Sequence, residues 1–190
     1  MERIKADAIL DAKGVACPIP IVKTKKEMKV LKPGHVLEIH ATDRGSTADL
    51  KAWADSAGHH YLGTVEDGGV LMHYVRKTTD AETGKKSYPH ISSNEKLEKY
   101  LASDKDIVVL DVREHAEYAF NHIPTAINIP LGEIEERLHE LNKKDEIYVV
   151  CRTGNRSDLV SRKLAVSGFT NVYNVVPGMS QWTGEVESFN

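Results

Sequence analysis

The sequence is poor in cysteine and aromatic residues, and it has no long apolar run. Its 190 residues include two cysteines, Cys17 and Cys151, and 6% aromatic side chains. Two cysteines are too few for a disulfide scaffold and, by themselves, for a structural zinc site. No segment approaches the ~18 consecutive apolar residues of a membrane span. The first residues carry acids early and lack the apolar core of a secretory signal. We therefore expect a cytoplasmic protein with no membrane partner.

A large excess of charge of one sign is also missing. The formal net charge is -3, with 28% charged and 41% hydrophobic residues. This composition is typical of a globular chain. It argues against nucleic-acid binding driven by bulk charge, so we expect no direct nucleic-acid partner.

The chain length allows one ordinary domain or two small ones. Residues 77–90 are polar, lack apolar periodicity and contain the breakers Gly84 and Pro89. We interpret them as a linker between a domain over 1–76 and a domain over 91–190. No internal repeat is visible.

The first domain alternates strands and helices before it ends in a hairpin. A helix should follow Cys17, and Ser46-x-x-Asp49 resembles a capping box at the start of a second helix. Asp67-Gly68-Gly69 is a strong hairpin turn. The predicted strands cover 4–10, 36–41, 61–66 and 70–76. The order β-α-β-α-β-β predicts a two-layer α+β sandwich.

The second domain has strands separated by helices, which predicts an α/β fold with a parallel sheet. The predicted elements are a helix from Ser93, a strand over 107–111, a strand over 127–129, a helix over 131–141, a strand over 147–150, a helix over 156–167 and a strand over 172–176. Ligands of such sheets bind beyond the carboxyl ends of the strands. Asp111 and Cys151 both stand at such ends, so we expect them to face one crevice.

Cys151 begins a short loop, Cys151-Arg152-Thr153-Gly154-Asn155-Arg156, between a predicted strand and a helix. Backbone N–H groups that point inward at a helix N-terminus form a site for an anion. Together with Arg152 and Arg156, they favour the thiolate form of Cys151 and attract anionic donors. An inert cysteine before an ordinary turn is the alternative, which this electropositive setting disfavours.

Two kinds of anion chemistry compete for this loop. Cysteine phosphatases place five residues between Cys and Arg, whereas four residues separate Cys151 from Arg156. This shorter loop resembles that of rhodanese-type sulfurtransferases. The likeness extends over 88–187 and includes Asp111-Val112-Arg113-Glu114, His122-Ile123-Pro124 and Gly178-Met179-Ser180-Gln181-Trp182. Phosphatase or arsenate-reductase chemistry remains an alternative that the loop length disfavours.

The resemblance implies ping-pong transfer of sulfane sulfur, with Cys151 as the nucleophile. The residues from Arg152 to Arg156 (Arg152, Thr153, Gly154, Asn155 and Arg156) would bind the substrate. Asp111 and Arg113 would support the loop rather than touch substrate. No metal or organic cofactor is required.

Cys17 belongs to a second motif, Cys17-Pro18-Ile19-Pro20, preceded by Gly14. Pro18 suits the first helical position, which would leave Cys17 at the N-cap, where the helix dipole favours a thiolate. The motif and the element order resemble the TusA-like sulfur-carrier family over 4–76. In that family this cysteine carries persulfide sulfur between proteins.

The sequence thus predicts a TusA-like carrier fused to a rhodanese-type sulfurtransferase, with sulfur passing between Cys151 and Cys17. Its partners would be a small anionic donor such as thiosulfate and a thiol or protein acceptor, and a homodimer stays open. The alternative is a relay adaptor that accepts persulfide from a partner without turnover. Donor, acceptor and direction of transfer are not fixed by the sequence.

Overall fold

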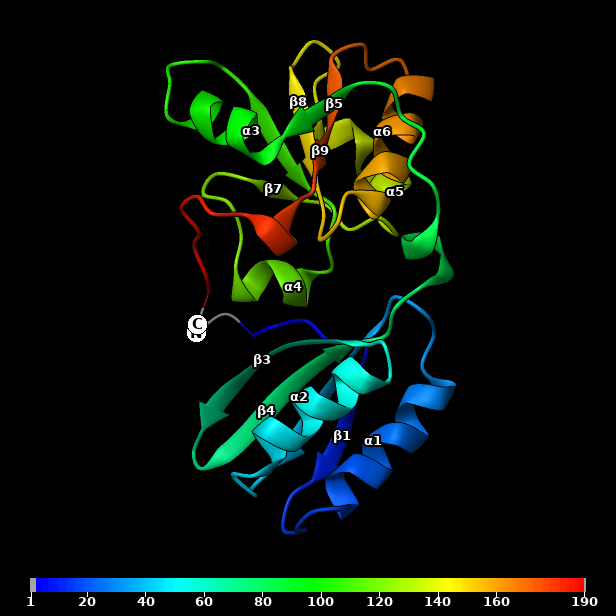
Figure 1. The fold of residues 1–190 in the computed structure, drawn as a ribbon, viewed down its shortest axis with the longest axis vertical. Coiled ribbons are helices and arrows are strands. Elements are labelled where there is room, and N and C mark those ends of the chain that lie inside the picture. The colour runs from blue at the N-terminus through cyan, green and yellow to red at the C-terminus, as the bar shows by residue number, and fades with distance from the viewer. Residues whose placement is uncertain (1–2, 190) are drawn as a thin grey trace. The chain divides into compact units, whose positions relative to one another are not determined.

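The computed structural model describes residues 3–189, which form two compact units with a boundary between Thr79 and Asp80. Each unit has its own sheet and its own core (Figure 1). Within the described residues, no helix is both long enough and apolar enough to cross a bilayer.

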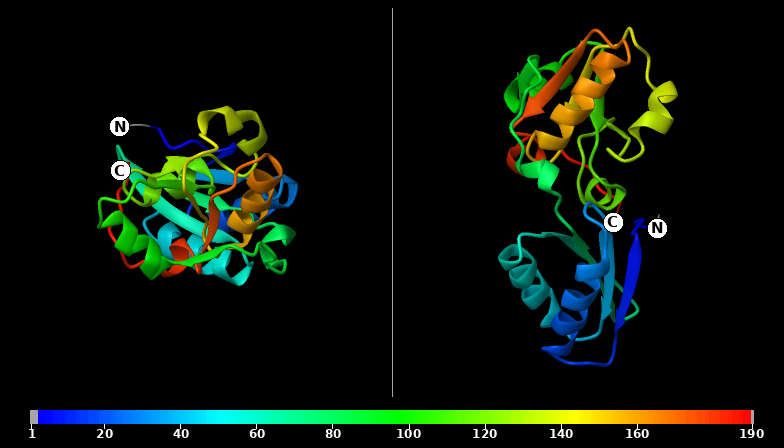
Figure 2. Two further views of the ribbon diagram at one scale, coloured as in Figure 1. Left: turned by 90° about the horizontal axis from the view of Figure 1, so that it is seen from above. Right: turned by 90° about the vertical axis from the view of Figure 1, so that its right-hand side faces the viewer.

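The first unit is the predicted two-layer sandwich. Its elements are β1 (Ala8–Ala12), α1 (Ile19–Val30), β2 (Val36–Ala41), α2 (Ser46–Ser56), β3 (His60–Asp67) and β4 (Val70–Arg76). The sheet order is β1-β2-β4-β3, with β1 parallel to β2 and the other pairs antiparallel. Both helices cover the same face of this sheet (Figures 1 and 2). The order β-α-β-α-β-β is therefore confirmed.

The second unit is the predicted α/β domain. Its strands and α-helices are β5 (Ile91–Ser93), α3 (Asn94–Leu101), β6 (Val108–Asp111), α4 (His115–Phe120), β7 (Ile127–Asn128), α5 (Ile134–Arg137), β8 (Ile147–Val150), α6 (Asn155–Val166) and β9 (Val172–Val176). Short 3-10 helices cover Asp80–Thr83, Leu138–Glu140 and Met179–Gln181. The sheet order is β5-β9-β8-β6-β7, and every pair of neighbours is parallel.

Both faces of this second sheet are buried. Along β8, Ile147 and Val149 join the apolar cluster that includes Val160 of α6. Tyr148 and Val150, which point the other way, join the cluster that includes Leu97 of α3. Figure 1 shows α3 on one side of the sheet and α5 and α6 on the other. Burial on both faces explains the continuous apolar run of β8.

The segment predicted as a linker is largely exposed, and side-chain and backbone contacts anchor it near both ends. The Lys77 ammonium donates to the carbonyls of Met28 and Leu31, at 2.6 and 2.7 Å. Tyr88 is buried in the core of the second unit, and its hydroxyl donates to the carbonyl of Val172. These contacts fix residues near both ends of 77–90, and the linker assignment stays a prediction. Their anchors lie far away in sequence, so local polarity could not reveal them.

Several local expectations also differ from the structure. The helix predicted over 131–141 is only α5 followed by one 3-10 turn, and the short elements β5 and α4 were not predicted. The expected capping box at Ser46 is wrong. Ser46 is the first residue of α2, and its hydroxyl donates to the carbonyl of Asp43 at 2.6 Å.

Candidate functional site

Cys151 lies directly after the central strand β8 and opens the loop that leads into α6. The loop ends at Gly154, whose φ of +87° is left-handed and favours glycine. A Cβ on Gly154 would also lie 2.6 Å from Cγ1 of Val176. Glycine is thus required here, and it lets the chain turn sharply from the sheet into the helix.

The sulfur of Cys151 is held by two donors. The backbone N–H of Gly154 donates to Sγ at 3.1 Å, and the Ser157 hydroxyl donates at 3.3 Å. The N-terminus of the 12-residue helix α6 follows immediately. Unpaired N–H groups and the helix dipole concentrate positive potential there. This arrangement directs hydrogen-bond donors and positive potential at the Cys151 sulfur.

Cys151 is only 1% exposed. The loop curls around the sulfur, so a reagent must enter the loop to reach it. Burial of this kind favours small or extended sulfur donors over bulky ones.

A second segment supports the loop through its carbonyl groups. The N–H of Met179 donates to the carbonyl of Cys151 at 2.8 Å, and the N–H of Ser180 donates to that of Arg152 at 2.9 Å. A Cβ on Gly178 would lie 2.5 Å from the Cys151 carbonyl oxygen, so only glycine fits this approach. The Asn94 side-chain amide, in turn, bonds both to the N–H and to the carbonyl of Gly178.

Arg156 pairs with Glu117 of α4 and also interacts electrostatically with Cys151. Its Nη1 and Nη2 donate to the two carboxylate oxygens at 2.7 and 2.8 Å, and both side chains are nearly completely buried. Burial alone would lower the pKa of Arg156, but the Glu117 carboxylate raises it above its ordinary value. This contact fixes the start of α6, and the predicted substrate contact of Arg156 stays a prediction.

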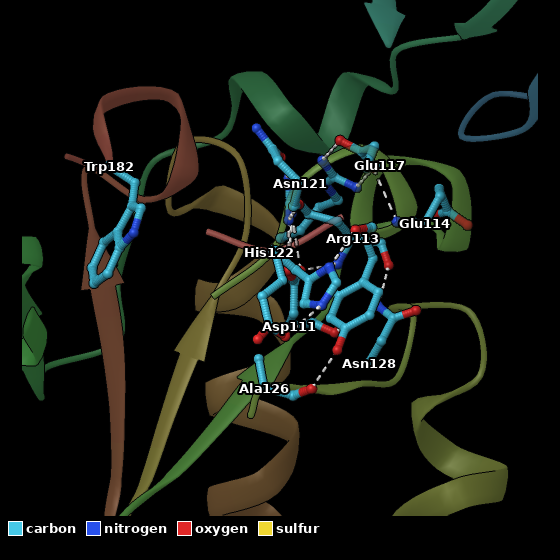
Figure 3. Close-up of polar contacts among 12 residues, drawn as sticks. Asp111, Arg113, Glu114, Glu117, Asn121, His122, Ala126, Asn128 and Trp182 are labelled. Atoms are coloured by element: carbon cyan, nitrogen blue, oxygen red, sulfur yellow. Dashed lines mark hydrogen bonds and ion pairs between the residues drawn. The ribbon is translucent and has the colours of Figure 1, made fainter. Parts of the chain in front are cut away.

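Asp111 and Arg113 form a second buried ion pair next to the first. Arg113 Nη2 donates to Asp111 Oδ2 at 2.7 Å and to the carbonyl of Asn121 at 2.6 Å (Figure 3). Burial opposes the charge of Arg113, and Asp111 reverses this, so its pKa is raised. These contacts join the end of β6 to the segment after α4, and the supporting role of both residues stays a prediction.

The remaining loop residues divide into two groups. Arg152 is exposed and Thr153 is half-buried. Asn155, in contrast, donates its side-chain amide to the backbone carbonyls of Glu82 and Gly84. Asn155 thus anchors the segment before β5. The substrate-binding roles of Arg152, Thr153, Gly154 and Asn155 stay predictions.

Cys17 lies in the turn between β1 and α1 and is exposed. α1 begins at Ile19 with Pro18 at the N-cap, so the predicted N-cap position of Cys17 is wrong by one residue. The backbone N–H of Cys17 donates to Asp43 Oδ2 at 3.2 Å. A carboxylate thus holds the turn that presents the thiol.

The electrostatic setting of Cys17 is opposite to the predicted one. A hydrogen bond with the Asp49 side chain is the main cause that raises the pKa of Cys17, with smaller contributions from desolvation and from the charge of Asp43. These carboxylates disfavour the thiolate form of Cys17, whereas the predicted N-cap position favours it.

Sequence reasoning missed several residues of the site. Ser157 follows Arg156 directly and points back at the sulfur, which its place in the first turn of the predicted helix could have suggested. Glu117 has one local signal, the capping box that it forms with Glu114 at the start of α4, although its pairing with Arg156 is distant in sequence. Asn174 gave no local signal, because its amide reaches the Gly154 carbonyl from another strand.

Comparisons with known proteins agree with this architecture. Residues 8–77 match the family model described as "Sulfurtransferase TusA", and residues 93–185 match the "Rhodanese-like domain". The chain belongs to the sulfur-carrier family that joins a TusA domain to a rhodanese-like sulfurtransferase domain.

Individual relatives support the same assignment. The chain is 54% identical over 185 residues to "Putative sulfur carrier protein YrkF" of Bacillus subtilis, covering 97% of this chain and 100% of that protein. It is 38% identical over 94 residues to "Putative sulfurtransferase YtwF" of the same organism, covering 50% of this chain and 90% of that protein. A crystal structure of a rhodanese-like domain protein from Staphylococcus aureus aligns with a TM-score of 0.50 and 33% identity, over 52% of this chain and 97% of that one.

Proposed function

We propose that this protein moves sulfane sulfur through persulfides on its two cysteines. Cys151 takes sulfur from thiosulfate or from a persulfide donor, and Cys17 exchanges sulfur with Cys151 and with a thiol or protein acceptor. The observation that carries the proposal is the Cys151 sulfur, held by the Gly154 N–H and the Ser157 hydroxyl at the start of α6. The exposed Cys17 of the TusA domain supplies the second thiol.

The first half-reaction is a displacement at sulfur. The Cys151 thiolate attacks the outer sulfur of thiosulfate, a new S–S bond forms, and sulfite leaves with the electrons of the broken bond. The persulfide anion lies near the donors that held the thiolate. The free N–H groups at the N-terminus of α6 stabilise its charge.

The second half-reaction returns Cys151 to its starting state. A nucleophilic thiolate attacks the outer sulfur of the persulfide, takes it, and releases the Cys151 thiolate. When Cys17 is the nucleophile, its thiol must first lose a proton, and Asp49, which hydrogen-bonds to the thiol, is placed to accept it. Transfer within one chain and transfer within a homodimer both fit this scheme. Both thiols must stay reduced, which suits a cytoplasmic location.

A relay adaptor without turnover is the competing function, because the relative that matches over 97% of the chain is named as a carrier. Steady-state transfer of sulfur from thiosulfate to cyanide separates the two. We expect turnover in the wild-type chain and in Cys17→Ser, and loss of turnover in Cys151→Ser with an unchanged circular-dichroism spectrum. Absence of turnover in the wild type, with sulfur still accepted from a protein persulfide, would support the adaptor. Hydrolysis of an aryl phosphate would instead point to phosphatase chemistry.

A further inference from the structure

The segment before β5 packs onto the Cys151 loop, and neither family model includes it. The match to the TusA model ends at residue 77, and the match to the rhodanese-like model begins at residue 93. Within the second unit, the side-chain amide of Asn155 holds the carbonyls of Glu82 and Gly84. This fixes one end of the segment at the start of α6.

The other end of the segment is fixed by Asp158. Its Oδ1 accepts the backbone N–H groups of Ser87 and Tyr88, at 2.9 and 2.8 Å, and its side chain is nearly completely buried. Tyr88 is itself buried in the core. Lys85 and Lys86 therefore lie between two anchors, and both anchors are in the first turn of α6.

This geometry brings Lys86 to the loop. A Cβ built on Gly154 would lie 3.2 Å from Cε of Lys86 and 3.5 Å from its Nζ. Gly154 is the residue whose N–H donates to the Cys151 sulfur. Lys86 is exposed and forms no ion pair with any residue in the part of the chain that the structure describes. Its charge is thus available to a ligand at the loop.

We propose that Lys86 is a substrate-binding residue of the sulfurtransferase site, which attracts the anionic sulfur donor to the loop around Cys151. This inference rests on the proposed function. Arg156, which the sequence had suggested for this task, is neutralised by Glu117, so the site draws its accessible cations from Arg152 and from the segment before β5. The segment before β5 would then contribute a residue to donor binding.

The test compares substitutions at two neighbouring lysines. Lys86→Met removes the charge and keeps the aliphatic stem that packs on Gly154, Lys86→Arg keeps the charge, and Lys85→Met is the matched control. One cation beside a dianion in partly screened surroundings changes affinity on the order of threefold to tenfold. We expect Lys86→Met to raise the KM for thiosulfate by that factor with little change in kcat, as for lost ground-state binding. Lys86→Arg and Lys85→Met should resemble the wild type.

A second readout does not depend on turnover. In a Cys17→Ser background, Cys151 is alkylated by iodoacetate, an anion, or by neutral iodoacetamide. Lys86→Met should lower the ratio of the two rates, and Lys85→Met should not. If the wild type shows no turnover, the proposed function fails, and this ratio still tests Lys86. Suppose that the wild type turns over, but the KM and the alkylation-rate ratio of Lys86→Met match those of Lys85→Met. Lys86 then does not bind the donor, and the inference is overturned.

Discussion

Replacing Glu117 with glutamine should destabilise the rhodanese-like domain far more than this nearly isosteric change implies. Glu117 accepts two hydrogen bonds from Arg156 and one from the Glu114 N–H. Arg156 is only 2% exposed. Glutamine would leave its guanidinium buried without a counter-charge, and breaking a buried pair in this way costs about 3–5 kcal/mol.

Urea unfolding of the full chain measures this loss. The chain has two tryptophans, so a Trp53→Phe background makes the fluorescence of Trp182 report on the domain that contains Glu117. Glu135→Gln is the matched control, because its partner Lys163 lies at the surface and the Glu135 side chain is 75% exposed. An exposed pair contributes less than about 1 kcal/mol.

A double variant separates the lost partner from other effects of the substitution. Arg156→Met combined with Glu117→Gln removes the unpaired charge, so it should recover much of the lost stability. The reasoning is refuted if Glu117→Gln costs no more than Glu135→Gln, or if the double variant is less stable than Glu117→Gln alone.

Three further predictions follow from the same contacts. Asp49→Asn should lower the pKa of Cys17, because the Asp49 hydrogen bond is the main cause that raises it. Alkylation of Cys17 by iodoacetamide near neutral pH should then be faster, and an unchanged rate would contradict this. Burial lowers the pKa of His73 to about 4 from 6.5, so its contribution to folding, at most about 3 kcal/mol, is present above pH 6.5 and lost as the pH falls toward 4. His73→Gln should therefore flatten the fall in unfolding free energy over that range, and an unaltered slope would count against it. Gly178→Ala should lower the free energy of unfolding by at least about 1 kcal/mol and slow sulfur transfer, because the new Cβ would lie 2.5 Å from the carbonyl oxygen of Cys151. Gly132→Ala, which has open space around it, should do neither.

The sequence was sufficient for the fold because the main signals are local. The hairpin at Gly68-Gly69 and the apolar run of β8 depend on the residues themselves and on their immediate neighbours. The short helix α4 has no such pattern. It is held by contacts such as the Arg156–Glu117 pair, which joins positions 39 residues apart. Patterns of hydrophobicity cannot reveal contacts of that range.

The candidate site was predictable in its cysteines and less so in their surroundings. The motif around Cys151 indicated a helix N-terminus, which the structure has, and the role of nucleophile stays a prediction. Charge was the weaker guide, because a sequence does not say which carboxylate a cation meets. Arg156 therefore looked available although Glu117 neutralises it, and Cys17 looked activated although Asp49 acts against a thiolate.

The relay between the two thiols is tested most directly by locating the transferred sulfur. The full chain is loaded with thiosulfate, digested, and examined by mass spectrometry for peptides that gain one sulfur atom. We predict added sulfur on Cys151 and on Cys17 in the wild type, on Cys151 alone in Cys17→Ser, and none on Cys17 in Cys151→Ser. Sulfur that never reaches Cys17, or that reaches it equally well without Cys151, would contradict the relay and assign the two domains to separate partners.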